Sequence, residues 1–221
     1  FYTGMIDEMF IAYVELLKTL AKNDKRFIEE TTTLVSLEIS DLRNEGNNTK
    51  KSFDDKSLDQ LFLDMEERFP EKIALVNKDI RVTYEELKEK SLYVCKRLRE
   101  VNVEKEELVV ILMKKSYKQV ISVFGILFSG AAYLPLDIKN PKERLYKILI
   151  DSKAKNILVE SEFLEENPWL KKWNCIVISG EEIEKDDSII VRKDTDAMAY
   201  TIYTSGITGT PKGDMISHKG A

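Results

Sequence analysis

Residues 199–213 read Ala-Tyr-Thr-Ile-Tyr-Thr-Ser-Gly-Ile-Thr-Gly-Thr-Pro-Lys-Gly, and this stretch decides the interpretation of the chain. The apolar run 199–203 predicts a strand, and the glycines and hydroxyls after it predict a loop. Glycine permits a positive φ, so several backbone N–H groups can turn toward one point and bind an anion. Hydroxyls and a lysine add donors and positive charge for phosphate oxygens. The candidate polyphosphate-binding residues are Thr204, Ser205, Gly206, Thr208, Gly209, Thr210, Lys212 and Gly213.

The general phosphate motif of P-loop proteins, G-x-x-x-x-G-K-[ST], does not fit this loop. Counting from Gly206 places Lys212 correctly, but Pro211 replaces the second glycine and Gly213 replaces the Mg²⁺-binding hydroxyl. A P-loop also opens a helix, and Pro-Lys-Gly is a poor helix start. A plain surface turn is the other alternative, but turns do not need a lysine together with so many hydroxyls.

The composition excludes some classes of protein. With 34 basic and 39 acidic residues among 221, the net charge of −5 argues against a nucleic-acid surface. Cys95 and Cys175 lack metal or C-x-x-C spacing, which favours small buried thiols and a reducing, cytoplasmic location. The uncharged stretch 119–136 is slightly short for a membrane span of ~20 residues. Its Ser-Gly-Ala-Ala segment and Pro135 divide it into a buried helix and a buried strand, so no membrane contact is expected.

The order of predicted elements indicates the α/β class. An amphipathic helix with its apolar face on Ile6, Met9, Phe10, Tyr13, Val14, Leu17 and Leu20 ends near residues 23–24, and a breaker-rich linker covers 44–51. Capping boxes then predict helix starts at Ser57/Gln60, Thr83/Glu86, Ser116/Gln119 and Asn140/Glu143, the last with Pro141 as first helical residue. Apolar runs at 73–76, 108–112, 133–136, 156–159 and 175–178 alternate with these helices. This alternation predicts a largely parallel sheet covered by helices on both faces, with ligands bound beyond the carboxyl ends of its strands.

Residues 203–213 resemble the phosphate-binding motif of adenylate-forming (AMP-binding) enzymes, Tyr-Thr-Ser-Gly-[Ser/Thr]-Thr-Gly-x-Pro-Lys-Gly. Residues 82–87 and 127–137 resemble the first two core motifs of nonribosomal peptide synthetase adenylation domains. Residues 5–13 resemble the last helix of a condensation domain. The resemblance therefore implies a condensation-domain tail at 1–27, an interdomain linker at 28–56, and the N-terminal part of an adenylation domain at 57–221.

The resemblance implies that an amino acid reacts with ATP to give an aminoacyl-adenylate and pyrophosphate. The acyl group would then pass to a phosphopantetheine thiol on a carrier protein. Thr204, Ser205, Thr208 and the backbone of Gly206 and Gly209 would hold the β- and γ-phosphates, Lys212 would supply catalytic positive charge, and Mg²⁺ would bridge phosphate oxygens. The family's amino-acid pocket and C-terminal lid would lie beyond Ala221, so we expect the chain alone to be inactive.

Two positions depart from the family pattern. Ile207 replaces a hydroxyl residue, and Asp214 places a carboxylate where relatives have a branched apolar residue. A carboxylate beside a phosphate site repels the ligand unless it faces solvent or a cation. An acyl- or aryl-CoA ligase of the same superfamily and a degenerate module that only scaffolds its neighbours therefore stay open. For His218, the only histidine, a structural or helix-starting role is favoured over a catalytic one.

Overall fold

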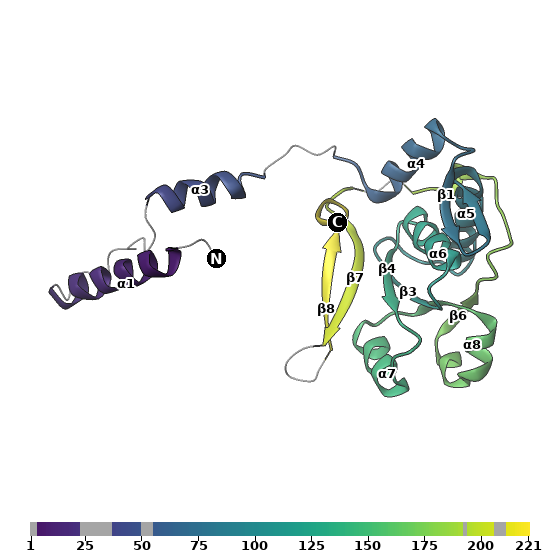
Figure 1. Ribbon diagram of the computed structural model, residues 1–221. Coiled ribbons are helices and arrows are strands. Elements are labelled where there is room, and N and C mark those ends of the chain that lie inside the picture. Colours follow the sequence, from purple (N-terminus) through teal and green to yellow (C-terminus); the bar gives the residue numbers. More distant parts are fainter. Residues whose placement is uncertain (1–3, 23–36, 50–54, 192–193, 206–210) are drawn as a thin grey trace. The chain divides into compact units, whose positions relative to one another are not determined.

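The computed structural model describes residues 4–22, 37–49, 55–191, 194–205 and 211–221 (Figure 1). The chain divides into two compact units, residues 1–54 and 55–221. The first unit contains helices α1 (Met5–Lys22) and α3 (Leu37–Asn47). Helix α1 ends where its apolar periodicity ends. Most of its predicted apolar face is solvent-exposed, with Phe10 65% exposed, whereas Val14 and Leu20 are half-buried.

Residues 44–47, the first part of the stretch 44–51 predicted as a breaker-rich linker, form the last turn of α3. The assignment of a linker between domains stays a prediction. Asparagine and glycine are frequent both in loops and at the C-termini of helices. Residue types that indicate a loop can therefore also end a helix. Residues 50–54 lie outside the described part of the chain.

In its described residues, the second unit contains two sheets and five α-helices that alternate with their strands (Figure 1). In chain order the elements are α4 (Leu58–Arg68), β1 (Ile73–Asn77), β2 (Ile80–Thr83), α5 (Tyr84–Glu100), β3 (Leu108–Leu112), α6 (Tyr117–Phe128), β4 (Ala132–Leu136), α7 (Lys142–Asp151), β5 (Asn156–Val159), α8 (Ser161–Glu166), β6 (Asn174–Val177), β7 (Met198–Ser205) and β8 (Pro211–Ser217). Short 3-10 helices cover Pro168–Lys172, Asp187–Ile189 and His218–Gly220.

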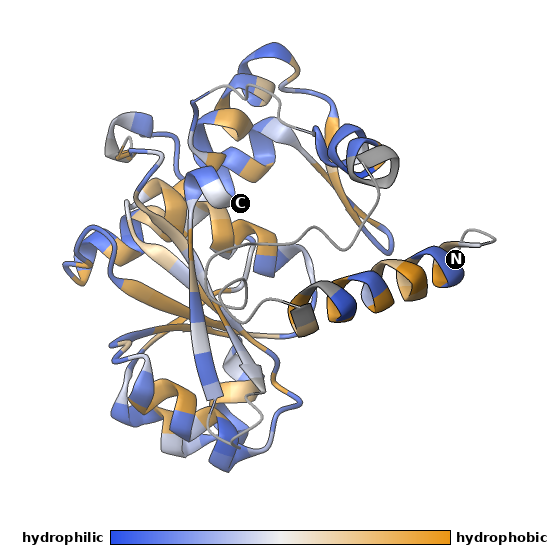
Figure 2. Ribbon diagram, turned by 90° about the vertical axis from the view of Figure 1, so that its left-hand side faces the viewer, coloured by the Kyte–Doolittle hydropathy of each residue, from blue (hydrophilic) through white to orange (hydrophobic). Residues whose placement is uncertain are grey.

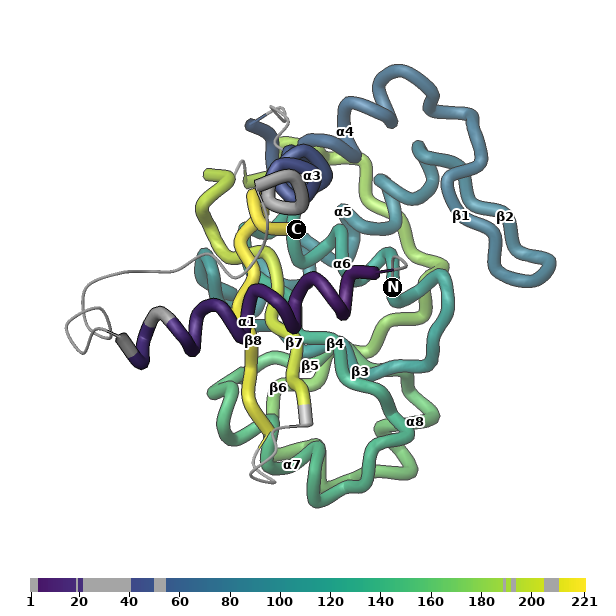
Figure 3. Tube along the Cα trace, turned by 60° about the vertical axis from the view of Figure 1, so that its left-hand side comes forward, coloured from purple at the N-terminus to yellow at the C-terminus, as the bar shows by residue number. Residues whose placement is uncertain are grey.

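The main sheet has the strand order β6-β5-β3-β4-β7-β8. The first five of these strands are parallel, which confirms the predicted α/β class. The outermost strand, β8, runs antiparallel to β7 and forms a hairpin with it (Figure 3). This hairpin was not predicted from the sequence.

Strand β1 does not join the main sheet, contrary to the prediction for residues 73–76. It pairs with β2 in a separate antiparallel hairpin. Only two residues separate these strands, and Lys78 takes the positive φ of 54° that such tight turns use. A parallel pairing would have needed a crossover connection, which two residues cannot provide.

The structure contains some of the predicted capping boxes and lacks others. At α5 the box is complete, since Glu86 N–H donates to Thr83 Oγ1 (3.1 Å) and Thr83 N–H donates to Glu86 Oε2 (2.9 Å). At α4 the Ser57 N–H donates to Gln60 Oε1 at 3.1 Å, but the Ser57 hydroxyl has no hydrogen-bond partner in the described residues, so only half of the box forms.

The other two boxes do not form as predicted. Ser116 precedes α6 without a side-chain capping bond. Helix α7 begins one residue later than predicted, with Pro141 at the N-cap position. Asn140 instead donates its side-chain amide to the carbonyl oxygen of Asp137 at 2.9 Å. A local turn therefore uses the side chain that the box required.

Helices cover both faces of the main sheet, as predicted (Figure 2), and each face has its own apolar cluster. Because strand side chains alternate between faces, β3 sends Val109 and Ile111 to one cluster and Val110 and Leu112 to the other. Helices α5 and α6 pack on the first face and α7 on the second. The uncharged stretch 119–136 forms most of α6 and all of β4, and no helix in the described ranges has the length and apolarity to cross a membrane.

Candidate phosphate-binding site

The candidate loop connects the two strands of the β7–β8 hairpin. Strand β7 is parallel to β4, so its end at Ser205 lies at the carboxyl edge of the parallel strands. This is the edge at which open α/β sheets bind ligands, and it is the position that we predicted for the loop. Gly206, Thr208, Gly209 and Thr210, together with Ile207, lie outside the described residues.

The two ends of the loop bring its flanking polar residues together. Thr204 lies opposite Lys212 in the hairpin register, and Ser205 lies opposite Pro211. Cβ atoms of directly opposed residues are about 5 Å apart and lie on the same face of the sheet. Thr204 and Lys212 are both exposed to solvent. A hydroxyl donor and an ammonium group thus flank the same end of the hairpin, which is a combination suited to phosphate oxygens.

Gly213 has a structural reason to be glycine. It lies opposite Tyr203 in the hairpin. A Cβ on Gly213 would lie 3.0 Å from Tyr203 Cε2 and 3.0 Å from Thr201 Cγ2, so the tyrosine ring packs directly over the glycine backbone. The predicted phosphate-binding role of Gly213 is therefore not needed to explain the residue, and it stays a prediction.

A contact that no sequence pattern indicated holds the loop end of β7. The hydroxyl of Tyr203 donates to Asp151 Oδ2 of α7 at 2.7 Å. Burial and this hydrogen bond to a carboxylate raise the pKa of the Tyr203 hydroxyl. The signal in the sequence was Tyr203 itself, a motif residue to which we assigned no role.

Asp214 lies two residues beyond Lys212 and opposite Ile202. Side chains alternate along a strand, so Asp214 shares the face of Lys212 but lies roughly 7 Å farther along β8, away from the loop. It is exposed to solvent. Water therefore screens the repulsion between Asp214 and an anion at the loop, so this carboxylate is a weaker obstacle to phosphate binding than its place in the motif suggests.

His218 lies at the other end of the hairpin, after the last residue of β8, and is only 3% exposed. Its Nδ1 accepts a hydrogen bond from the backbone N–H of Leu58 (3.1 Å), and the 3-10 helix begins at His218 itself. The expected structural, helix-starting role agrees with this placement, which is removed from the loop by the length of β8.

The two cysteines lie apart from the candidate loop, and Cys95 is buried whereas Cys175 is half-buried. Burial raises the pKa of Cys95 to about 12, and burial also raises the pKa of Cys175. In the part of the chain that the structure describes, no group of His, Cys, Asp and Glu side chains is arranged to hold a metal ion.

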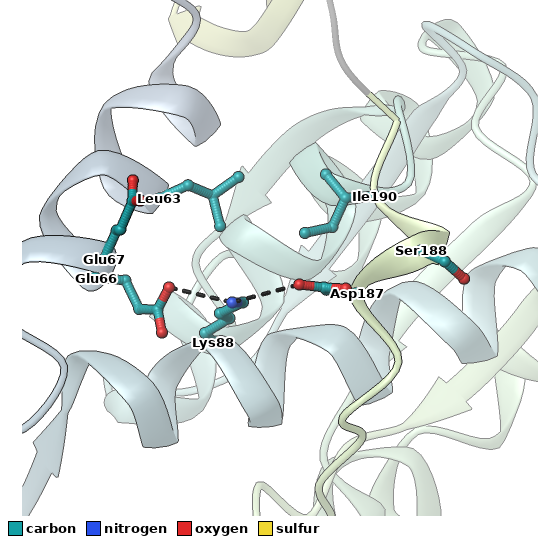
Figure 4. A pocket seen from close by; sticks show the side chains of 7 residues that line it. All are labelled: Leu63, Glu66, Glu67, Lys88, Asp187, Ser188 and Ile190. Carbon is teal, nitrogen blue, oxygen red and sulfur yellow. Dashed lines mark hydrogen bonds and ion pairs between the residues drawn. The ribbon is translucent and has the colours of Figure 1, made fainter.

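A cavity of about 430 Å³ lies elsewhere, between α4, α5 and the segment around Asp187 (Figure 4). Lys88 contacts two of its carboxylates, at 3.1 Å from Glu66 Oε2 and 3.7 Å from Asp187 Oδ2. The lining residues are Leu63, Glu66, Glu67, Lys88, Asp187, Ser188 and Ile190. None of them is a candidate phosphate-binding residue. Its excess of carboxylates would repel a phosphate, so we do not assign the nucleotide to this cavity.

The chain matches the family described as AMP-binding enzyme over residues 62–221. Gramicidin S synthase 2 of Brevibacillus brevis is 33% identical over 207 residues, which is 93% of this chain and 5% of that protein. Tyrocidine synthase 1 of Brevibacillus parabrevis is 36% identical over 171 residues, or 75% of this chain and 15% of that protein. The chain thus spans only a small part of the curated relatives that it matches.

The crystal structure of the nonribosomal peptide synthetase FmoA3 in its AMPPNP-bound form superposes with a TM-score of 0.81. It is 27% identical and covers 99% of this chain, which in turn covers 24% of that structure. The chain belongs to the AMP-binding enzyme family, and its second unit is the N-terminal part of an adenylation domain of the nonribosomal peptide synthetase type.

Proposed function

We propose that the protein containing this chain activates an amino acid with ATP, forming an aminoacyl-adenylate and releasing pyrophosphate. The acyl group would then be loaded onto the phosphopantetheine thiol of a carrier protein, with a condensation domain as a further partner. The observation that carries the proposal is the β7–β8 hairpin, which brings Thr204 and Lys212 together beside the motif loop at the carboxyl edge of the sheet.

The chemistry of the described donors fits a triphosphate. Thr204 offers a hydroxyl donor and Lys212 a positive charge, and both face solvent, where a ligand can reach them. Lys212 would neutralise charge that develops on the leaving pyrophosphate. Mg²⁺, when bound with ATP, would supply further positive charge to the phosphate oxygens. Ser205, Gly206, Thr208, Gly209, Thr210 and Gly213 complete the proposed set.

The test is amino-acid-dependent ATP–pyrophosphate exchange by the full protein that contains this chain. Loss of a charge-assisted hydrogen bond costs about 1.5–3 kcal/mol. The Lys212→Ala substitution should therefore lower kcat/KM for ATP in the exchange assay by roughly 10- to 100-fold. Lys219→Ala is the matched control, because Lys219 is another exposed lysine, at the opposite end of the hairpin. Equal activity of the two variants would refute the role of Lys212.

The choice of substrate class is tested in the same assay. Exchange that depends on an amino acid supports the synthetase, whereas exchange that depends only on a fatty or aromatic acid supports the CoA-ligase alternative. No exchange with either class, together with no heat of MgATP binding in calorimetry, supports the scaffold alternative.

We also propose that the isolated 221-residue chain is inactive, because by resemblance to the family the amino-acid pocket and the C-terminal lid would belong to other parts of the adenylation domain. Stoichiometric pyrophosphate release by the isolated chain, dependent on one amino acid, would contradict this.

A further inference from the structure

A buried histidine joins the end of the β7–β8 hairpin to the first turn of α4. His218 Nδ1 accepts the N–H of Leu58, which comes 160 positions earlier in the chain, at 3.1 Å. Leu58 is the first residue of α4, and the N–H groups of a first helical turn have no partner within the helix. The side chain of His218 therefore caps α4 from a distant part of the sequence. This bond also requires His218 Nδ1 to be unprotonated, because a protonated nitrogen cannot accept.

Main-chain bonds fix the same histidine to the start of the hairpin. The N–H of His218 donates to the carbonyl oxygen of Ala197 at 3.0 Å, and the N–H of Lys219 donates to that of Thr195 at 2.9 Å. Thr195 in turn donates its hydroxyl to Asp55 Oδ1 at 2.6 Å. Both chain segments at the base of the hairpin are thus tied to residues 55–58 at the start of the second unit.

Buried polar groups around the Leu58 N–H make the loss of its hydrogen bond to His218 costly. The side chain of Asp59, on the first turn of α4, is 1% exposed and its Oδ1 lies 3.9 Å from His218 Nδ1. Neither carboxylate oxygen of Asp59, nor the buried hydroxyl of Ser57, has a hydrogen-bond partner within the described residues. An additional unsatisfied N–H at Leu58 would add to a site that already contains unpaired buried polar atoms.

The hairpin depends on this base because its attachment to the sheet is narrow. In the described residues β7 pairs with β4 at one register position, Tyr133 opposite Tyr200, whereas β3 and β4 pair at five. The two tyrosine rings stack there with centroids 5.2 Å apart. The Tyr203–Asp151 hydrogen bond holds the loop end of β7, and the bonds of His218 and Thr195 hold the opposite end, so the angle of the hairpin is set at both ends.

The geometry converts a small tilt into a large displacement at the loop. The loop begins after Ser205, five residues beyond Tyr200 along β7, which is roughly 16 Å at about 3.3 Å per residue. A tilt of about 5° about Tyr200 would move the start of the loop by about 1.4 Å. Misplacement of a catalytic group by about 1 Å can cost about 100-fold in rate.

We propose that His218 is a positioning residue for nucleotide binding, acting by accepting the Leu58 N–H and thereby fixing the angle of the hairpin that carries the motif loop. The inference rests on the proposed function, since it assigns the loop to ATP. It predicts that the acceptor atom, and not the ring or its charge, is what position 218 must supply.

Three substitutions distinguish a requirement for the hydrogen-bond acceptor at position 218 from a requirement for the imidazole ring. His218→Asn retains an acceptor at the place of Nδ1, because asparagine Oδ1 is the same number of bonds from the backbone. His218→Gln moves the amide one bond farther out, and His218→Ala removes it. In the full protein, the Ala and Gln variants should raise KM for ATP by about tenfold or more, with a smaller change in KM for the amino acid, and Asn should restore KM to within about threefold.

Hydrogen exchange of the peptide that contains Leu58 tests the tether without using activity. Exchange at Leu58 should be faster in His218→Ala and His218→Gln and close to normal in His218→Asn. Normal Leu58 exchange in the Ala variant, or the same KM for ATP in all three variants, would overturn the inference.

Two further variants keep the outcomes distinct. If His218→Ala fails to fold, Thr195→Val tests the second tether and should raise KM for ATP in the same direction, whereas an unchanged KM overturns the inference. If the full protein shows no acid-dependent ATP–pyrophosphate exchange, the proposed function fails, while Leu58 exchange still decides whether His218 holds α4.

Discussion

Substituting Gly125 with alanine should destabilise the second unit, because α5 and α6 approach closely at this glycine. A Cβ added there would lie 2.6 Å from Val94 Cγ1, closer still to Val94 Cβ, and 2.8 Å from the backbone oxygen of Ser91. Overpacking of this kind costs about 1–3 kcal/mol. The higher helix propensity of alanine returns about 1 kcal/mol. The carbonyl of Ser91 belongs to the backbone of α5 and cannot rotate away, so we expect a net loss of about 1–2 kcal/mol.

Urea unfolding followed by tryptophan fluorescence measures this loss. Both tryptophans of the chain, Trp169 and Trp173, belong to the second unit, so the signal reports that unit. With a urea dependence near 2–3 kcal/mol/M, the midpoint should fall by about 0.5 M. Gly220→Ala is the control, since its new Cβ would meet Ser217 Oγ at an ordinary 3.5 Å. A Gly125→Ala variant as stable as the control would refute the close packing of α5 on α6.

Two further predictions concern single side chains. Thr83→Ala removes the side-chain acceptor of the complete capping box and should lower the unfolding free energy by about 1 kcal/mol, whereas an unchanged urea midpoint would contradict the box. Because burial raises the pKa of Cys95 to about 12, the folded thiol keeps its proton where the unfolded thiol loses it. Stability should therefore fall as pH rises from about 9 to 12, and less so in Cys95→Ala. Native iodoacetamide labelling should leave Cys95 unmodified until urea unfolds the chain, and rapid native labelling would contradict its burial.

The sequence predicted the parallel sheet because each of its strands carries a continuous apolar run, as strands buried on both faces do. The run at 73–76 is equally apolar, but it pairs with β2 and not with the main sheet. Strand β2 was not predicted, because Arg81 and Thr83 interrupt its apolar pattern. Strand β8 was equally hard to predict, since it begins with Pro211 and contains Lys212, Gly213 and Asp214. These residues disfavour a central strand but are tolerated at the edge of a sheet, where proline can occupy the first position.

The site was predicted in part for a similar physical reason. A short loop motif specifies which donors lie next to one another in the chain, so Thr204 and Lys212 could be assigned together. Their register across the hairpin required β8 to be recognised as a strand. The contacts of His218 with Leu58 and of Tyr203 with Asp151 join residues 160 and 52 positions apart, and no local pattern encodes such partners.

A strand, and not a helix, follows the motif loop, and this affects how the loop attracts anions. In loops that open a helix, the aligned peptide dipoles add a partial positive charge that the protein partly shields from solvent ions. Here β8 takes the place of that helix, and the charge nearest the loop in the described strands belongs to the solvent-exposed Lys212. Counterions surround an exposed ammonium group, with a Debye length of about 8 Å at physiological ionic strength. The attraction that this lysine exerts on a nucleotide is therefore set as much by the salt of the medium as by the fold.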